Sequence, residues 1–170
     1  RSSSAARAVA RAPRDAPLRP GVLDRLMLPE GTPRAQLHEL DARDLCAAVA
    51  RDLDWLLNTK RWLPDDLADF PEASRSILTY GLPDLSTFSW RNAGDSQSIA
   101  RLLEETIRRF EPRLRERSVK VTPLAGNDVD DFRLRFRIDA TLEVEPIQLP
   151  VSFDTDVDFD ASRITVRGEP

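Results

Sequence analysis

The stretch Phe110-Glu111-Pro112-Arg113-Leu114, here called the seam, separates two parts of the chain with different hydrophobic periods. Before the seam, apolar residues recur at the spacing of one helical face. After it they alternate with polar residues, which is the period of a strand. Pro112 lacks an N–H group and clashes with the preceding turn, so it predicts the end of a helix. We therefore expect helices before the seam and strands after it.

Two amphipathic helices are predicted before the seam. The first begins at Asp41, a good N-cap, and runs to Thr59. The second begins near Asp95 or Ser96 and ends at Phe110. Their apolar faces contain Leu45, Ala48, Val49, Leu53 and Leu56 in the first helix, and Ile99, Leu102, Leu103, Ile107 and Phe110 in the second. Their solvent faces contain Asp44, Arg51, Asp52 and Asn58 in the first helix, and Arg101, Glu104, Glu105, Arg108 and Arg109 in the second.

A shorter helix is expected between these two. Phe70-Pro71 predicts its entry, because proline is well accommodated in the first helical turn. Ile77 and Leu78 would lie on its buried side, and Gly81 would end it.

Four strands are predicted after the seam, of which the first and the last are short. Their apolar residues are Val119 and Val121; Phe132, Leu134, Phe136 and Ile138; Ile147, Leu149, Val151 and Phe153; and Ile164 and Val166. Helices come first and strands last, without βαβ alternation. This order predicts an α+β fold in which the helices pack on one face of a small antiparallel sheet formed by the C-terminal half.

A row of arginines and a row of aspartates stand out in the strands. Arg133, Arg135 and Arg137 alternate with apolar residues, and acids recur at 154, 156, 158 and 160. A hairpin turning near Glu145 would bring both rows to the solvent face, where each cross-strand pair contributes about 0.2–1 kcal/mol. The arginines are thus candidate contacts on the sheet face. The acids also resemble the start of a calcium loop, although Phe159 and Thr165 stand where that loop needs glycine and glutamate.

Composition is that of a soluble globular protein, with 41% hydrophobic and 32% charged residues in 170. A net charge of −4 gives no reason to expect nucleic acid or an anionic membrane as a partner. Cys46 is the one cysteine and His38 the one histidine, which argues against disulfides and clustered Cys/His metal sites. We expect a buried inert thiol at Cys46, no cofactor, no direct membrane insertion and a cytoplasmic setting.

The first twenty residues differ in composition from the rest. Residues 1–20 are rich in Arg, Ala, Ser and Pro and lack helical or strand periodicity, so we expect a disordered basic tail. An organelle transit peptide and a basic arm that folds on a partner are alternatives. Residues 21–169 are expected to form a single domain.

The sequence contains few candidate catalytic residues. A serine nucleophile would need a base, and nothing ties His38 to a serine. A glycosidase needs two placed carboxyl groups, and Glu111 beside Phe110 is the only acid that looks placed. The seam can otherwise be interpreted as a plain helix terminus followed by surface charge, or as an acid and a base presented to a partner.

Four separated stretches together resemble one family. They are Val22-Leu23-Asp24-Arg25-Leu26, Asp54–Lys60, Ser76–Ser86 and Glu111-Pro112-Arg113. They are similar to the leading segment, the end of the first helix, the central segment and the Glu-Pro-Arg signature of TssE-type baseplate wedge proteins of the bacterial type VI secretion system. Lys60 departs from the family, in which arginine is more usual. The resemblance covers the chain from about residue 22 to residue 169.

The resemblance implies a structural, non-enzymatic component of a contractile injection machine. Such a protein would join the wedge subunits TssF and TssG near TssK and the spike, and contact the first sheath ring of TssB and TssC. Its sheet could accept or donate strands at its edges. Glu111, Pro112 and Arg113 would dock on the wedge. The family is also described as lysozyme-like, so a cell-wall glycan hydrolase using Glu111 is the alternative.

Overall fold

The computed structural model describes residues 22, 26, 42–61, 67–74, 76–89, 92–124, 132–144 and 147–169. The predicted tail at residues 1–20, His38 and the predicted N-cap Asp41 lie outside the described residues. Of the leading segment, Val22 and Leu26 are described, and both side chains are exposed.

The described part of the chain consists of two long helices, short helical turns and four strands. Their order is α2 (Ala42–Asn58), η2 (Leu67–Asp69), α3 (Pro71–Ser74), η3 (Ile77–Thr79), η4 (Leu85–Thr87), α4 (Ala93–Phe110), η5 (Glu116–Ser118), β1 (Lys120–Pro123), β2 (Arg133–Val144), β3 (Ile147–Asp158) and β4 (Arg163–Glu169). Helices come before the seam and strands after it, so the predicted α+β class is confirmed.

The strands form one antiparallel sheet in the order β1-β2-β3-β4. Its centre is the hairpin of β2 and β3, which pairs Arg133 with Asp158 at one end and Val144 with Ile147 at the other. The hairpin therefore closes between Val144 and Ile147, in agreement with the predicted hairpin, and Glu145 itself lies outside the described residues. Alternate residues of the two strands point into the core: Leu134, Phe136, Ile138, Ala140, Leu142, Val151, Phe153, Thr155 and Val157 are buried.

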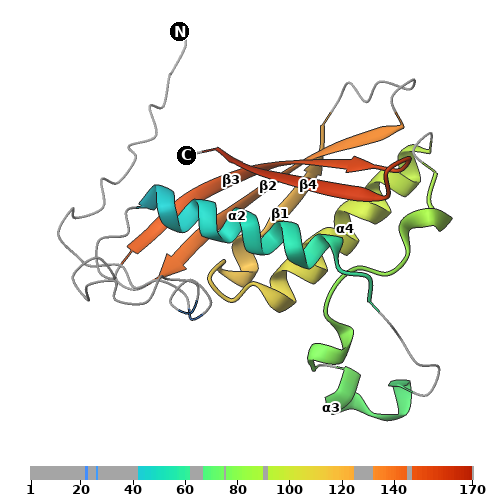
Figure 1. The fold of residues 1–170 in the computed structure, drawn as a ribbon, viewed down its shortest axis with the longest axis horizontal. Helices are drawn as coiled ribbons and strands as arrows, with labels where there is room; N and C mark the ends of the chain where they lie inside the picture. Colours follow the sequence, from blue (N-terminus) through green and yellow to red (C-terminus); the bar gives the residue numbers. More distant parts are fainter. Residues whose placement is uncertain are drawn as a thin grey trace, which may run out of the picture.

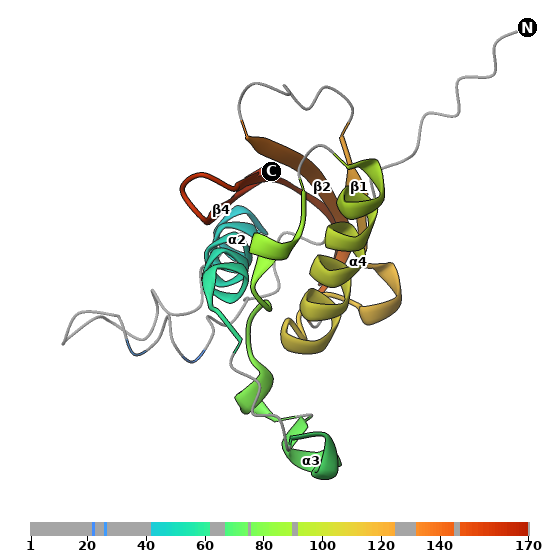
Figure 2. The same cartoon turned by 90° about the vertical axis from the view of Figure 1, so that its right-hand side faces the viewer.

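Helices α2 and α4 cover one face of the sheet and leave the other to solvent (Figures 1 and 2). Helix α2 lies along β4, and α4 lies along β1. Their apolar stripes join the inward row of the sheet in one core cluster. The helices contribute Leu45, Cys46, Val49, Ala50, Leu53, Leu56, Leu57, Ile99, Ala100, Leu103 and Ile107. The predicted burial of Cys46 is confirmed.

Helix α4 begins earlier than predicted. Asn92 is its N-cap, because the side chain of Asn92 accepts a hydrogen bond from the N–H of Gly94. Asp95, predicted to start the helix, lies in its first turn, and its carboxylate accepts a hydrogen bond from the N–H of Ser89. The end of the helix at Phe110 agrees with the prediction from Pro112.

The predicted entry of a short helix at Phe70-Pro71 is confirmed, since α3 begins at Pro71, but the predicted burial of Ile77 and Leu78 is wrong. The segment forms the separate short helices η2, α3 and η3, which project away from the sheet (Figures 1 and 2). Ile77 is 76% exposed and Leu78 is 55% exposed. Ser76 begins a tight turn by accepting the N–H of Leu78, and this turn buries Thr79 instead.

The predicted inward position of Phe132 is also wrong. Phe132 lies just before β2, has a positive φ of 51° and is 48% exposed. Its carbonyl accepts the N–H of Phe159 at 3.0 Å, so its backbone closes the end of the hairpin while its ring stays outside the core.

Gly81 holds the segment after η3 against the end of α2. Leu82 donates its N–H to the carbonyl of Thr59 at 2.9 Å, and Arg61 donates to the carbonyl of Leu82 at 2.7 Å. Gly81 has φ +100°, and a Cβ at this position would lie 2.2 Å from the Thr59 oxygen. Glycine is therefore required both by the backbone conformation and by the close approach.

We predict that Gly81→Ala lowers the free energy of unfolding by about 2 kcal/mol or more, because it adds strain and a backbone clash. Gly94→Ala is the matched control, since a Cβ there meets only the side chain of Asn92, at 3.3 Å. Urea denaturation measures both variants. Similar, small losses in the two variants would show that the close approach at Thr59 does not constrain the fold.

Candidate functional site

Glu111 and Arg113 of the seam face each other across the turn at Pro112. Arg113 donates from its backbone N–H and from Nε to Glu111 Oε1, at 3.1 and 2.8 Å. Its Nη2 donates to Glu111 Oε2 at 2.6 Å. Both carboxylate oxygens of Glu111 are therefore engaged, and the residue is only 4% exposed.

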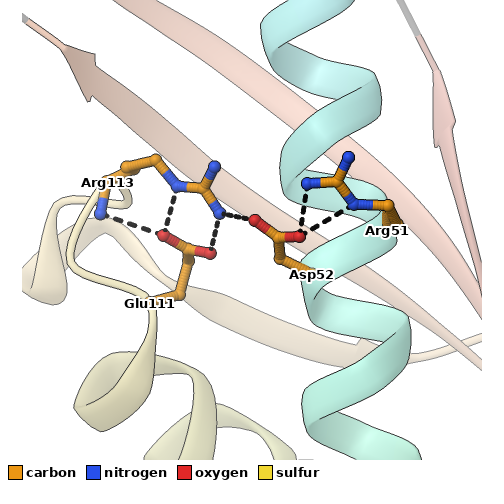
Figure 3. A network of polar contacts seen from close by, with 4 residues as sticks. All are labelled: Arg51, Asp52, Glu111 and Arg113. Carbon is orange, nitrogen blue, oxygen red and sulfur yellow. Dashed lines mark hydrogen bonds and ion pairs between the residues drawn. The ribbon is translucent and has the colours of Figure 1, made fainter. Parts of the chain in front are cut away.

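Arg113 also reaches helix α2. Its Nη2 contacts Asp52 Oδ2 at 2.6 Å, and the other oxygen of Asp52 accepts two hydrogen bonds from Arg51, at 2.8 and 3.0 Å (Figure 3). We call Glu111, Arg113 and Asp52 the Arg113 clamp. Because Asp52 and Arg113 are 61 residues apart in sequence, the clamp ties the first helix to the exit of the second.

The charges of the clamp shift the pKa of neighbouring groups. Burial lowers the pKa of Arg113, but hydrogen bonds and charge attraction from Glu111 and Asp52 outweigh burial and raise it above its ordinary value. Burial raises the pKa of the Tyr80 hydroxyl, and the negative charges of Asp52 and Glu111 raise it further. Tyr80 therefore stays neutral and packs edge-on against Phe110 at 5.3 Å between ring centroids.

The backbone of the seam belongs to the sheet. Glu143 of β2 donates its N–H to the carbonyl of Arg113 at 2.8 Å, and Arg115 donates to the carbonyl of Thr141 at 2.9 Å. Leu114 lies between these bonds, forms a β-bridge with Leu142 and is buried. One short segment thus contacts α2, α4 and β2.

The predicted arginine row lies on a different surface. Arg133, Arg135 and Arg137 stand opposite Asp158, Asp156 and Asp154 in the register of β2 and β3, as the hairpin prediction required. Two of these pairs form ion pairs, Arg133 with Asp158 at 2.9 Å and Arg137 with Asp154 at 3.0 Å. Arg167 of β4 extends the row by approaching Asp156 at 3.4 Å.

These ion pairs bear on whether the aspartates could instead bind a metal ion. Asp154, Asp156 and Asp158 each pair with an arginine of a neighbouring strand. Across the described ranges, no cluster of three or more His, Cys, Asp or Glu residues is arranged to hold a metal ion. Within the same ranges, no helix is long and apolar enough to cross a membrane.

The β4 edge of the sheet is covered by side chains of α2. Asn58 donates from Nδ2 to the carbonyl of Ile164 at 2.6 Å and accepts the N–H of Ile164 at 2.9 Å. Asp54 accepts the N–H of Val166 at 3.3 Å. These side chains make the hydrogen bonds that a fifth strand would otherwise make.

The rise per residue of a helix and of a strand explains why Asn58 and Asp54 of α2 meet alternate residues of β4. Four helical residues rise about 6.0 Å and two strand residues about 6.6 Å, so every fourth residue of α2 meets every second residue of β4. The next position in the series pairs Ala50 with Gly168, where a Cβ on Gly168 would lie 3.7 Å from that of Ala50. Alanine has no acceptor, so Gly168 gains no cap from α2.

The β1 edge is covered by α4 in the same way. Glu104 accepts the N–H of Val121 at 3.0 Å, and Arg108 donates to the carbonyl of Val119 at 2.8 Å. The two side chains also pair with each other at 2.6 Å. Pro123 has no N–H to offer at the end of the strand. This edge is therefore closed to a further strand.

Sequence reasoning missed four of these residues. Asp52, Asn58, Glu104 and Arg108 were assigned to solvent faces, because a helical pattern separates polar from apolar positions but does not show which polar positions lie beside a strand edge. In the structure each of them holds a backbone group or an opposite charge from another element.

We predict that Arg113→Ala lowers the free energy of unfolding by about 3 kcal/mol, because it leaves the buried Glu111 without its partner. Arg115→Ala is the control, since Arg115 pairs with Glu143 at the exposed surface. It should leave the urea midpoint close to that of the wild type. Equal midpoints for the two variants would contradict a structural role for the clamp.

The protein family described as baseplate wedge protein gp25 matches residues 43–147, from α2 to the first residue of β3. No curated protein and no solved structure matches the chain. The family match spans well over half of the 170 residues and contains the whole clamp. This chain belongs to the gp25 family of baseplate wedge proteins, structural parts of contractile injection machines.

Proposed function

We propose that this chain is a TssE-type baseplate component of a bacterial type VI secretion machine. It docks on the wedge subunits TssF and TssG, near TssK and the spike, and helps the sheath proteins TssB and TssC begin to polymerise. The observation that carries the proposal is the family match over residues 43–147, which includes the Glu111-Pro112-Arg113 signature. Such a machine is assembled at the membrane from the cytoplasm, which is where we place the protein.

The wedge-docking surface is the outer side of the Arg113 clamp. Pro112 is exposed, and the side chain of Arg113 keeps 23% of its surface accessible. Trp55, which is 45% exposed, lies on α2 with the Arg51 guanidinium 5.1 Å from its ring centroid. Tryptophan and arginine are enriched among residues that dominate binding energy at interfaces. This combination supports docking through the exposed parts of the clamp.

Glu111 acts in this proposal by positioning Arg113. Its burial leaves no surface for a direct contact of useful size, and its oxygens are already bonded by Arg113. A contact made by Arg113 depends on the fixed orientation of the guanidinium, and Glu111 and Asp52 together fix that orientation. The signature works as a unit for this reason.

Sheath assembly would use the sheet. Of its two edges, β4 has no side-chain cap from α2 at Gly168, where Ala50 faces it, whereas β1 is capped by α4 and ends in proline. An added partner strand would therefore extend from the C-terminal end of β4. Arg133, Arg135 and Arg137 form a second contact surface, because their side chains stay partly exposed beside the aspartate row.

A glycan hydrolase is not proposed. A general acid must meet its substrate, and Glu111 is buried behind Arg113. Asp52 is the other acid of the clamp, but the same guanidinium nitrogen of Arg113 contacts both carboxylates, at 2.6 Å each. The geometry supports a structural role.

The proposal predicts that the chain co-purifies with TssF and TssG, and that Trp55→Ala weakens this binding about tenfold or more. Arg113→Glu should do the same, with circular dichroism reporting whether that variant folds. Trp55→Ala removes an exposed ring and should leave the fold intact. Glu105→Ala, at an exposed position of α4, is the control and should bind like the wild type.

Two results would contradict the proposal. A wild-type chain that fails to co-purify with wedge subunits would exclude the function, and wild-type affinity in both folded variants would exclude this docking surface.

A further inference from the structure

Three large apolar side chains are exposed on the segment formed by η2, α3 and η3, residues 67–79, which we call the projecting lobe. Phe70 is 59% exposed, and Ile77 and Leu78 are each more than half exposed. Single exposed apolar residues are common on protein surfaces, but several on one projecting segment favour an interaction site. The lobe extends from the side of α2 and α4 that faces away from the sheet, where a partner could reach it (Figures 1 and 2).

Internal hydrogen bonds hold these side chains outward. The hydroxyl of Ser76 donates to the carbonyl of Ala73 at 2.7 Å, and the hydroxyl of Thr79 donates to the carbonyl of Ser76 at 3.0 Å. Thr79 is buried by this turn, whereas Ile77 and Leu78 are left at the surface. The exposed apolar residues therefore belong to a hydrogen-bonded turn, and a partner would not have to order it.

The lobe is tied to the helix that ends at the seam. Arg109 of α4 donates from Nη2 to the carbonyl of Ser74, and its guanidinium lies 5.0 Å from the ring centroid of Phe110. Tyr80, which follows the lobe, packs edge-on against the same ring. Burial, and then the charges of the two clamp carboxylates, raise the pKa of Tyr80, so the base of the lobe lies beside the clamp. A partner docked on the outer side of the clamp would meet the lobe as part of the same surface.

The charges of the lobe are mainly negative. Asp69 and Glu72 are exposed and form no ion pair or hydrogen bond with the described residues. In the sequence, residues 62–79 contain two further acids and a single base, Arg75. Arg109, at the base of the lobe, is already engaged with a lobe carbonyl. These charges favour a partner with cations around its apolar surface, and they disfavour an anionic bilayer, which attracts basic segments.

We propose that the projecting lobe packs its exposed apolar side chains against an apolar surface of a partner protein that is bordered by lysine or arginine residues. Phe70, Ile77 and Leu78 are the anchors, and Asp69 and Glu72 pair with the bordering cations. The inference rests on the proposed function for the identity of the partner, which is the wedge subunit docked on the clamp. The wedge-docking surface then has two parts, the outer side of the clamp and the lobe, and α4 connects them.

A double variant tests the anchors in the complex with TssF and TssG. Ile77→Ser combined with Leu78→Ser should weaken binding about tenfold or more, because two aliphatic side chains are no longer buried in the interface. Both positions are exposed in the free chain, so the variant should fold, and circular dichroism checks that it does. Phe132→Ser is the matched control, since it removes an exposed apolar ring outside the lobe and should bind like the wild type.

Wild-type affinity of the folded double variant would overturn the lobe proposal and leave the proposed function intact. A wild-type chain that does not bind TssF and TssG would instead exclude the proposed function, and the partner chemistry of the lobe is then decided by a measurement that needs no wedge subunit.

That measurement is a methyl NMR titration of the purified full chain, followed at Ile77 and Leu78. The probes are the blocked peptide Leu-Lys-Lys-Leu-Leu-Lys-Lys-Leu-Leu-Lys and its analogue with glutamate in place of every lysine. We expect saturable shifts with the lysine peptide, at a Kd on the order of 1 mM, and at least about fivefold weaker binding of the glutamate peptide. Asp69→Lys combined with Glu72→Lys should reverse this preference.

Two results of these binding measurements would overturn the proposal. The first is the absence of saturable shifts at Ile77 and Leu78 with the lysine peptide, or equal binding of the two peptides. The second is sedimentation of the chain with phosphatidylglycerol or phosphatidylcholine vesicles that the Ile77→Ser, Leu78→Ser variant loses, because it would assign the lobe to a membrane. We expect no sedimentation with either kind of vesicle.

Discussion

The Arg113 clamp is the interaction on which the arrangement of the two halves depends. A buried carboxylate at Glu111 is costly unless it is paired and hydrogen-bonded, and Arg113 satisfies both of its oxygens. The same guanidinium reaches Asp52, and the backbone of Arg113 is bonded to β2. Arg113 therefore connects the end of α4, one face of α2 and the start of the sheet.

Beyond the clamp, the sheet has two edges and one solvent face that a partner could meet. Helix side chains cover the two edges of the sheet, and the far face carries a row of paired charges. Each feature limits where a partner can bind. Docking beside Trp55 and strand addition near Gly168 would be two separate contacts, which suits the proposed role of a component that is surrounded by other subunits in an assembly.

The sequence predicted the features of the fold that depend on hydrophobic periodicity. It did not predict the features that depend on contacts between distant segments. The helical faces, the alternating strands and the shared solvent face of the arginine and aspartate rows follow from spacing. The exposure of Ile77 and Leu78 does not, because apolar composition cannot distinguish a buried helix from a projecting turn. The contact of Arg113 with Asp52 could not be predicted either, since the two residues are 61 positions apart and nothing local in the sequence signals the contact.

The most direct test of this account is a double-mutant cycle between Asp52→Ala and Arg113→Ala, measured by urea denaturation. If the clamp joins the two halves, the free-energy changes of the single variants will not add, and the coupling energy will be about 1–2 kcal/mol. Changes that add to within about 0.5 kcal/mol would mean that the two side chains act independently, and would contradict the account.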